Sequence, residues 1–348
     1  MKCVIKGINI EAISAYLPKK IREMDSLIPV YGEKAVKQTV SGTGIERLHV
    51  ADEDETSSDM CYEAAEHLIQ KEQIDRSTID GLVMVSQTFD YLGPASSIIL
   101  QDRLQLSKDT VCFDIMYGCS GYIYGIYQAS MMISSGSCKK VLLVNAELNT
   151  RFMDDTEKDH VMVFGDAASA TLITKGIGEL AFHICSDGSR HKSVLNLVNG
   201  FRPPILIRNN KVPLKSDGKP VLAINDGLAV FDFIIHEGLG SIKTILKDIG
   251  WNIDEVDFFA LHQAVKVTLD FVNKRLKVDK KKSPFYSQNS GNTSSCTIPL
   301  LITSFVHGEQ VDTSNWNKVI LSGFGLGLSW GSIACDLSNT RIYKPINI

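Results

Sequence analysis

Apolar residues in the first half of the chain gather in short continuous runs that polar and glycine-rich stretches separate. Three runs of strand length stand at 79–88 (IDGLVMVSQT), 111–117 (VCFDIMY) and 139–148 (KKVLLVNAEL). Continuous apolar runs of this length are typical of strands that are buried on both faces. The pattern therefore predicts a layered α/β architecture with a mainly parallel sheet covered by helices.

The longest apolar stretch of this half lies between the second and third runs. Residues 120–136 (SGYIYGIYQASMMISSG) are apolar on nearly every side of a helix, and Gly136 closes the stretch. This composition predicts a fully buried helix that ends near the glycine. The segment 164–173 (FGDAASATLI) predicts a further strand that is entered through a glycine turn.

The same order of patterns returns in the second half of the chain. The matched pairs are 79–88 with 253–264 (IDEVDFFALHQA), 110–129 with 283–302 (SPFYSQNSGNTSSCTIPLLI), and 139–152 with 317–330 (NKVILSGFGLGLSW). A single pair is readily a chance likeness between short apolar runs, whereas three pairs in order indicate an internal duplication. We therefore expect two similar halves, 1–175 and 176–348, that pack against each other.

Composition limits the classes of binding partner and the cellular location that we expect for this chain. The chain has 348 residues, 44% of them hydrophobic, so it can bury one large core or two domains of ordinary size. A formal net charge of -4 gives no general positive field for nucleic acid or an anionic membrane, although 279–283 (DKKKS) forms a short basic stretch. Neither a membrane span nor a signal peptide is indicated. We expect small-molecule or protein partners, no nucleic acid, no membrane, and a cytoplasmic location.

The cysteines argue against a metal site and against a disulfide framework. No Cys-x-x-Cys pair occurs, and no histidine stands at metal-ligand spacing, so we expect no metal cofactor. In a reducing compartment most of these residues are expected to be small buried hydrophobic side chains. The eight are Cys3, Cys61, Cys112, Cys119, Cys138, Cys185, Cys296 and Cys335.

Cys119 stands apart because it occupies the corner between the run 111–117 and the predicted helix. Gly118 and Gly121 flank it and allow a tight turn and close approach of a substrate. The unpaired N–H groups and the dipole of a first helical turn stabilise a thiolate, so the sequence predicts a lowered pKa for this thiol. Cys119 is therefore a candidate nucleophile, which needs an acid-base partner and donors for developing negative charge.

The second half offers a histidine and an asparagine at corresponding corners. His262 lies where the apolar run in FFALHQAV ends and a helical pattern begins, and Asn292 lies in NSGNTSSCTIP at the counterpart of the Cys119 corner. The alternatives are a histidine that satisfies a helix end and an asparagine that acts as a helix cap. If the two halves pack as the repeat indicates, His262 and Asn292 face Cys119.

Five ordered motifs resemble a known family over nearly the whole chain: DIMYGCSGYIYG, FGDAASA, LHQA, GNTSSCTIP and GFGLGLSWGS. They resemble the β-ketoacyl-acyl carrier protein synthase III family of the thiolase superfamily. The resemblance implies a duplicated, layered α-β-α-β-α fold with two mixed five-stranded sheets, and a homodimer. It also implies a Cys-His-Asn triad at Cys119, His262 and Asn292, with an oxyanion hole made by the backbone N–H groups of Cys119 and Leu326.

The resemblance implies the following chemistry. Cys119 takes an acyl group from a thioester, a malonyl thioester loses carbon dioxide, and the enolate attacks the acyl-cysteine in a decarboxylative Claisen condensation. The substrates are carried as phosphopantetheine thioesters on acyl carrier protein or coenzyme A, and no further cofactor is expected. The setting is fatty-acid or specialised-metabolite synthesis. Two alternatives stay open: acyl transfer to an oxygen or nitrogen acceptor without decarboxylation, and a non-catalytic partner subunit.

Several positions depart from the family pattern around the substrate entrance. The family's tryptophan and arginine that clamp the coenzyme A nucleotide have no counterpart in 36–45 (VKQTVSGTGI), and an asparagine of the family is absent from 226–231 (DGLAVF). Val265 and Val267 replace an asparagine of the pantetheine tunnel and an arginine associated with carrier docking. The expected tunnel residues are Gly227, Phe231, Ala264 and Val265.

The expected acyl pocket also differs from the family pattern. The family's Phe-Gly-Gly-Gly reads FGLG here, which adds the Leu326 side chain beside the oxyanion loop. Gly93 aligns with a phenylalanine that the partner subunit contributes in the family, and Leu92 could take that role after a small shift. These differences favour a specialised homologue at least as readily as the initiating enzyme of fatty-acid synthesis.

Overall fold

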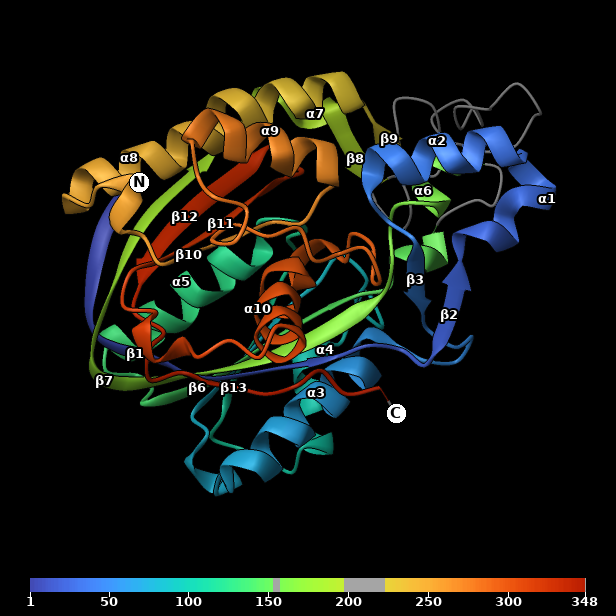
Figure 1. The fold of residues 1–348 in the computed structure, drawn as a ribbon. Helices are drawn as coiled ribbons and strands as arrows, with labels where there is room; N and C mark the ends of the chain where they lie inside the picture. Colours follow the sequence, from blue (N-terminus) through green and yellow to red (C-terminus); the bar gives the residue numbers. More distant parts are fainter. Residues whose placement is uncertain (153–156, 197–222, 348) are drawn as a thin grey trace.

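The computed structural model describes residues 1–152, 157–196 and 223–347 and shows alternating layers of helices and strands (Figure 1). Two helices lie in the middle, strands lie on both sides of them, and further helices cover the outer faces. The middle helices are α5 (Gly121–Ser134) and α10 (Thr297–Gly308), and the main outer helices are α3 (Ser57–Glu72), α4 (Ser96–Arg103), α8 (Leu239–Ile249) and α9 (Lys266–Leu276).

The strands of the two halves meet through two long shared strands. The strands are β1 (Lys2–Tyr16), β4 (Gly81–Val85), β5 (Val111–Ile115), β6 (Lys140–Glu147), β7 (Ala167–Ser186), β10 (Phe258–Leu261), β11 (Val319–Gly325), β12 (Ser329–Cys335) and β13 (Arg341–Ile342). In the first half β5, β4 and β6 are parallel and β7 is antiparallel to β6. In the second half β10 and β11 are parallel and β12 is antiparallel to β11. Strands β1 and β7 pair with each other and extend through both halves, which joins the strands into one nine-stranded network.

This architecture confirms the predicted layered α/β fold with mixed sheets. The expectation of a mainly parallel sheet is wrong, because β7 pairs antiparallel with β1, β6 and β12, and β11 pairs antiparallel with β12. If the two parts of β1 and of β7 are counted separately, each half has a mixed set of five strands, β5-β4-β6-β7-β1 and β10-β11-β12-β7-β1. The three apolar runs of the first half are β4, β5 and β6, the apolar segment 120–136 is α5, and the segment 164–173 enters β7. The pattern of continuous apolar runs therefore located these elements correctly.

The repeat fails at one place, where the first half has β5 and the second half has no strand. Residues 283–293 form an irregular segment with a turn at 288–290, and an isolated bridge joins Asn292 to Phe164. Pro284 has no N–H group for a strand ladder, and Gly291 has a φ of 73°, which is outside the strand region. The expected strand is therefore replaced by a turn that leads into α10.

The two middle helices are fixed by burial on all sides. One apolar cluster contains side chains of α5, α10 and the facing strands, among them Ile123, Ile126, Leu301 and Ile302. Burial of each such side chain stabilises the fold by about 1.5–3 kcal/mol. The N-terminal ends of α5 and α10 are consequently held in fixed positions, and these ends follow the Cys119 and Asn292 corners.

The remaining elements lie around this core, and several gather at one side of the molecule (Figure 1). They are β2 (Lys20–Glu23), α1 (Ile28–Tyr31), α2 (Glu33–Thr43), β3 (Arg47–Val50), α6 (Lys158–Val161), β8 (Val194–Asn196), β9 (Ala223–Asn225) and α7 (Gly227–Phe233). Within the described residues, no helix has the length and apolar character that crossing a membrane requires.

Candidate active site

Cys119 lies in the turn between β5 and α5, two residues before the first residue of the helix. The turn is tight, since the backbone N–H of Gly121 donates to the carbonyl of Gly118 at 2.6 Å. The end of β11 covers the cysteine closely: a Cβ on Gly325 would lie 2.5 Å from the Cys119 Cβ and 3.1 Å from its Sγ. Only glycine at position 325 leaves room for the cysteine side chain.

His262 follows the last residue of β10 and is buried. Its backbone N–H donates to the carbonyl of Ser322 at 2.8 Å, which fixes it to β11. Its ring Nδ1 lies 2.6 Å from the Thr297 Oγ1, and the same hydroxyl is within 3.0 Å of the Ser294 carbonyl. Burial lowers the pKa of His262 to about 3, so the ring is neutral at physiological pH.

Thr297 leaves both neutral tautomers of His262 open. When its hydroxyl donates to the Ser294 carbonyl, Nδ1 of His262 carries the proton and donates to Oγ1, which leaves Nε2 as a base. When the hydroxyl rotates and donates to Nδ1, Nε2 carries the proton and is a donor. Rotation of one hydroxyl therefore exchanges a base for a hydrogen-bond donor at Nε2.

Asn292 is held by backbone pairing to the segment before β7. Its N–H donates to the Val163 carbonyl at 2.8 Å, and its carbonyl accepts from Gly165 N–H at 3.2 Å. The side-chain Oδ1 accepts from the backbone N–H of Ser294 at 2.9 Å. A hydrogen bond of this kind is also expected of an asparagine that caps a helix. It fixes the orientation of the side-chain amide, so that Nδ2 is the group able to donate to a ligand.

The turn that leads into α10 joins the three residues. Cys119 Sγ lies 3.7 Å from the Ser294 Oγ, Asn292 contacts the Ser294 N–H, and His262 reaches the Ser294 carbonyl through Thr297. The ring of His262 also meets Phe324 edge to face with centroids 5.5 Å apart, one residue before Gly325. The structure therefore brings the three sequence-predicted residues to one site.

The protonation state of Cys119 differs from the sequence-based prediction. Burial raises the pKa of the Cys119 thiol to about 12, although the Ser294 hydroxyl acts in the opposite direction. The expectation of a lowered pKa is wrong, because removal from water disfavours the thiolate more than the first helical turn favours it. At neutral pH the nucleophile starts as a thiol and needs a base.

Four residues of this site were not singled out from the sequence: Gln87, Glu147, Ser294 and Thr297. Glu147 is fully buried at the end of β6, and burial raises its pKa to about 8. Its Oε2 accepts from the Gln87 backbone N–H at 3.3 Å and from the Gln87 Nε2 at 3.5 Å, and the same Nε2 donates to the Ser294 Oγ at 3.0 Å. The sequence offered one signal for Glu147, since a carboxyl group inside the apolar run 139–148 is unusual in a buried strand.

Leu326 lies in the turn between β11 and β12, directly beside the Cys119 corner. Its carbonyl accepts from the Ser329 hydroxyl at 2.7 Å, and a Cβ on Gly118 would lie 2.2 Å from the Leu326 Cδ2. Gly118 is consequently needed for this packing. The Leu326 side chain therefore packs against the turn that carries Cys119, and the role of its backbone N–H in an oxyanion hole stays a prediction.

A cavity of about 1180 Å³ opens beside Gly118 and Leu326. Its lining also includes Gln87, Met116 and Leu92. Leu92, which was expected in the acyl pocket, therefore lines the cavity with a side chain that is 73% exposed. Gly93, the other expected pocket residue, is not part of the lining, and a Cβ there would meet nothing within 4 Å.

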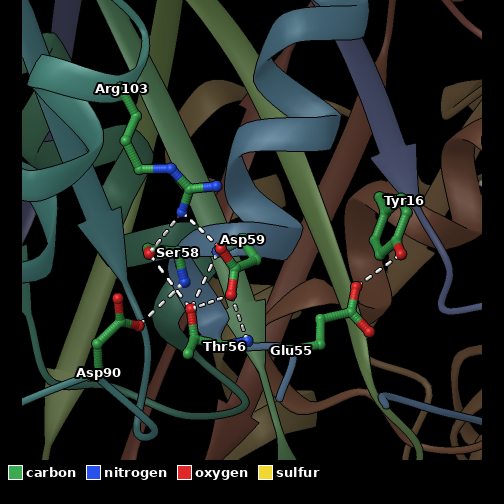
Figure 2. A network of polar contacts seen from close by, with 7 residues as sticks. All are labelled: Tyr16, Glu55, Thr56, Ser58, Asp59, Asp90 and Arg103. Atoms are coloured by element: carbon green, nitrogen blue, oxygen red, sulfur yellow. Dashed lines mark hydrogen bonds and ion pairs between the residues drawn. The ribbon is translucent and has the colours of Figure 1, made fainter. Parts of the chain in front are cut away.

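The loop after β4, which forms one wall of this cavity, is tied to the start of α3 (Figure 2). The Asp90 carboxylate accepts from the Ser58 backbone N–H at 3.1 Å. Arg103 donates to the Ser58 hydroxyl at 3.1 Å and pairs with Asp59 at 2.7 Å. Thr56 caps α3 by accepting from the Asp59 N–H at 3.2 Å. This network holds the wall in place.

The four expected tunnel residues lie apart from this cavity, at the start of α7 and between β10 and α9. Gly227 begins α7, and Phe231 of that helix meets Phe271 of α9 with ring centroids 5.3 Å apart. Ala264 donates its backbone N–H to the His262 carbonyl at 3.1 Å, and Val265 precedes α9. Their role as a tunnel stays a prediction.

Over the described ranges, no group of three or more metal-binding side chains gathers at a common point.

Comparisons with known proteins agree with this arrangement. The family description 3-oxoacyl-[acyl-carrier-protein (ACP)] synthase III matches residues 113–188, and its C-terminal counterpart matches residues 246–337. A beta-ketoacyl-[acyl-carrier-protein] synthase III of Streptococcus sanguinis is 30% identical over 327 residues, which cover 93% of this chain and 98% of that protein. Its Streptococcus gordonii counterpart is 29% identical over 331 residues, covering 94% and 99%. A crystal structure of 3-oxoacyl-(acyl-carrier protein) synthase from Burkholderia xenovorans LB400 matches with a TM-score of 0.93 and 27% identity, covering 100% of this chain and 99% of that one.

Proposed function

The chain belongs to the 3-oxoacyl-[acyl-carrier-protein] synthase III family of the thiolase superfamily, and from this premise we propose that Cys119, His262 and Asn292 are its catalytic triad. The reaction is the condensation of a Cys119-bound acyl group with a malonyl thioester, in cytoplasmic fatty-acid or specialised-metabolite synthesis. The observation that carries the assignment is that Cys119 and Asn292 both contact Ser294 and that His262 is connected to the same residue through Thr297.

In the first half-reaction the Cys119 sulfur attacks the carbonyl carbon of an acyl thioester. Because burial raises the pKa of Cys119 to about 12, a base must take the thiol proton. Neutral His262, with its proton on Nδ1, offers Nε2 for this purpose. The carbon-sulfur bond to the carrier then breaks, and the leaving thiolate takes the proton back. The N–H groups of Cys119 and Leu326 stabilise the oxyanion.

In the second half-reaction a malonyl thioester loses carbon dioxide and becomes an enolate. Negative charge develops on the thioester oxygen, and two donors face it in the proposal: His262 Nε2 in its second tautomer and Asn292 Nδ2. Carbon attack on the acyl group forms the new carbon-carbon bond and releases the Cys119 thiolate, which takes up a proton. The product is a 3-oxoacyl thioester.

A direct test separates this function from the two alternatives. Incubation with an isotopically labelled acyl thioester, followed by mass spectrometry, should find the label on the Cys119 peptide. Addition of malonyl thioester should then release carbon dioxide and a 3-oxoacyl thioester. Label on Cys119 that moves to an oxygen or nitrogen acceptor without carbon dioxide would identify an acyltransferase. A protein that takes no label from any acyl thioester would be a non-catalytic subunit.

Acyl carrier protein is the proposed donor rather than coenzyme A. The nucleotide clamp of the family is missing from 36–45, and Val265 and Val267 remove polar contacts. Each lost contact weakens binding by about 0.5–1.5 kcal/mol, so coenzyme A thioesters should react with a kcat/KM about a hundredfold lower than matching carrier-protein thioesters. Both donors should be measured with one acyl group at one salt concentration. Equal or better use of coenzyme A would contradict the prediction.

The proposed docking surface for the acyl carrier protein is the basic region formed by α9 and the segment that follows it. Lys266 and Lys280 both pair with Asp270, and Lys282 donates to the Val256 carbonyl at 2.7 Å, so these three lysines already have partners. Lys281 is the exposed lysine to test. Lys281→Glu should lower the rate with carrier-protein thioesters only, whereas Lys71→Glu on α3, in the opposite outer layer, should change neither rate.

A homodimer through β5 is the proposed assembly. β5 is the edge strand of the sheet, and Phe113 on it and Met116 after it are 44% and 72% exposed. Exposed apolar side chains on an edge strand are typical of an interface. Leu92 and Met116 line the same cavity, so a partner at this edge would also close it.

We therefore expect Phe113→Asp to convert a dimer into a monomer, since an ionised carboxylate at the centre of an apolar interface would lack a partner. Light scattering after gel filtration measures the mass. Leu228→Asp is the matched control, because Leu228 is 85% exposed but lies on α7. A wild-type monomer, or a Phe113→Asp variant that stays dimeric, would contradict this interface.

A further inference from the structure

Ser294 contacts Cys119 and Asn292 directly, and it is connected to His262 through Thr297. Its hydroxyl lies 3.7 Å from the Cys119 Sγ, and its N–H donates to the Asn292 Oδ1 at 2.9 Å. Its carbonyl accepts from the Thr297 hydroxyl that lies against His262. Ser294 is buried and has a φ of 52°, a left-handed conformation that is uncommon for a residue with a Cβ. Backbone outliers of this kind concentrate at functional sites.

The direction of the hydrogen bond between Ser294 and Cys119 follows from the donor on its other side. Gln87 Nε2 lies 3.0 Å from the Ser294 Oγ and carries only donors. Since the serine oxygen accepts from Gln87, the one hydroxyl proton of Ser294 is left for another acceptor. The Cys119 sulfur lies 3.7 Å from that oxygen, so the hydroxyl donates to it.

Glu147 fixes the orientation of the Gln87 amide. Its Oε2 accepts from Gln87 at two points, the backbone N–H at 3.3 Å and the Nε2 at 3.5 Å. The two hydrogens of Nε2 are thereby shared between Glu147 and Ser294. If the amide were reversed, Gln87 Oε1 would face Glu147 Oε2, and with an ionised carboxyl two acceptors would lie 3.5 Å apart. Below the Glu147 pKa of about 8, a proton on Oε1 leaves Oε2 as the acceptor of the same two bonds.

We propose that Ser294 is a fourth catalytic residue, whose hydroxyl donates to the Cys119 sulfur and stabilises the thiolate as it forms, with Gln87 and Glu147 as positioning residues. The role rests on the proposed function, in which Cys119 is the nucleophile. The same hydrogen bond stabilises the sulfur again when the condensation breaks the acyl-cysteine bond and returns the thiolate. Glu147 opposes this thiolate through its charge once it ionises, which its pKa of about 8 places at alkaline pH.

The test uses alkylation of Cys119 by iodoacetamide, because this reaction needs a thiolate but no acyl substrate. Sulfur displaces iodide, and mass spectrometry of the Cys119 peptide gives the rate at each pH between 6 and 10. Loss of a hydrogen bond to a charged group should move the profile about one pH unit upward, which is about a tenfold slower reaction at pH 7.5. We expect this shift in both Ser294→Ala and Ser294→Gly.

The two substitutions separate the hydroxyl from the backbone. Glycine adopts a φ of 52° without strain, whereas alanine has the same restriction as serine. Equal shifts in both variants would assign the effect to the hydroxyl. Thr293→Val is the matched control, since the Thr293 hydroxyl is buried in the same turn and contacts no hydrogen-bond partner within the described part of the chain. It should leave the profile unchanged.

Gln87→Met provides an independent measurement if the Ser294 variants fold poorly. It removes the donor that orients Ser294 and should shift the profile in the same direction by a smaller amount. Wild-type alkylation profiles in Ser294→Ala, Ser294→Gly and Gln87→Met would overturn the proposal, as would an equal shift in Thr293→Val. Failure of the proposed function would look different: the wild-type Cys119 would be alkylated normally and never acylated.

Discussion

Cys119→Ser is expected to lower acylation by acyl thioesters at least about a thousandfold, because a serine hydroxyl at this position is a much weaker nucleophile than a thiolate. The substitution keeps the shape of the side chain, and Gly325 leaves room for it. Transfer of a radiolabelled acyl group, followed by mass spectrometry of the site, measures the loss. Since burial raises the pKa of the Cys119 thiol to about 12, alkylation should accelerate through the alkaline range rather than reach a plateau at mildly acidic pH.

Two other cysteines are the natural competitors for label. Cys296 is fully buried, with Sγ 3.3 Å from the Ala167 carbonyl, and burial holds its pKa well above the usual range. Cys112 is half-buried on β5 with Sγ 3.6 Å from the Thr110 carbonyl. Cys112→Ala and Cys296→Ala should keep the acylation of Cys119. Label that persists on either residue in Cys119→Ser would show that the nucleophile is assigned wrongly.

The second large effect concerns the donors of the condensation step. We expect Asn292→Asp to lose malonyl decarboxylation by about 30-fold to 1000-fold, since one oxyanion donor contributes about 2–4 kcal/mol to the barrier. Aspartate keeps the shape of asparagine and the Oδ1 that accepts from Ser294 N–H, so the turn is preserved. The Nδ2 donor is replaced by a buried carboxyl oxygen, which cannot stabilise the enolate. Acylation of Cys119 should fall much less.

His262→Ala should behave differently from the Asn292 variant. His262 is the proposed base for the Cys119 thiol and a donor to the enolate, so both half-reactions should decline. Release of carbon dioxide from malonyl thioester and single-turnover acylation measure the two steps separately. Equal loss of both steps in Asn292→Asp would place Asn292 in acylation, and no loss in either variant would return both residues to structural roles.

The neighbourhood of the nucleophile shows which properties depend on long-range contacts. Cys119 and Ser294 are 175 residues apart in the sequence, and Gln87 and Ser294 are 207 apart. No pattern within a short window predicts that these groups meet. The raised pKa of Cys119 has the same origin, because the chain segments that exclude water from it come from both halves. The sequence predicted the helix N-terminus, which lowers the pKa of the thiol. It did not predict the burial that raises this pKa by a larger amount.

The sequence by itself determined the strand runs, the buried helix α5, the duplication, and the positions of Cys119, His262 and Asn292. These follow from local rules: apolar runs indicate buried strands, and glycines indicate turns. The short motifs at the turns between strands and helices contain the three candidate catalytic residues. Tertiary structure alone decided that 283–293 forms no strand, that Cys119 is a thiol at neutral pH, and that Ser294 contacts Cys119 and Asn292 and is connected to His262 through Thr297. The desolvation of a buried group and the direction of its hydrogen bonds both depend on neighbours from distant parts of the chain. Only the packed fold brings these neighbours together.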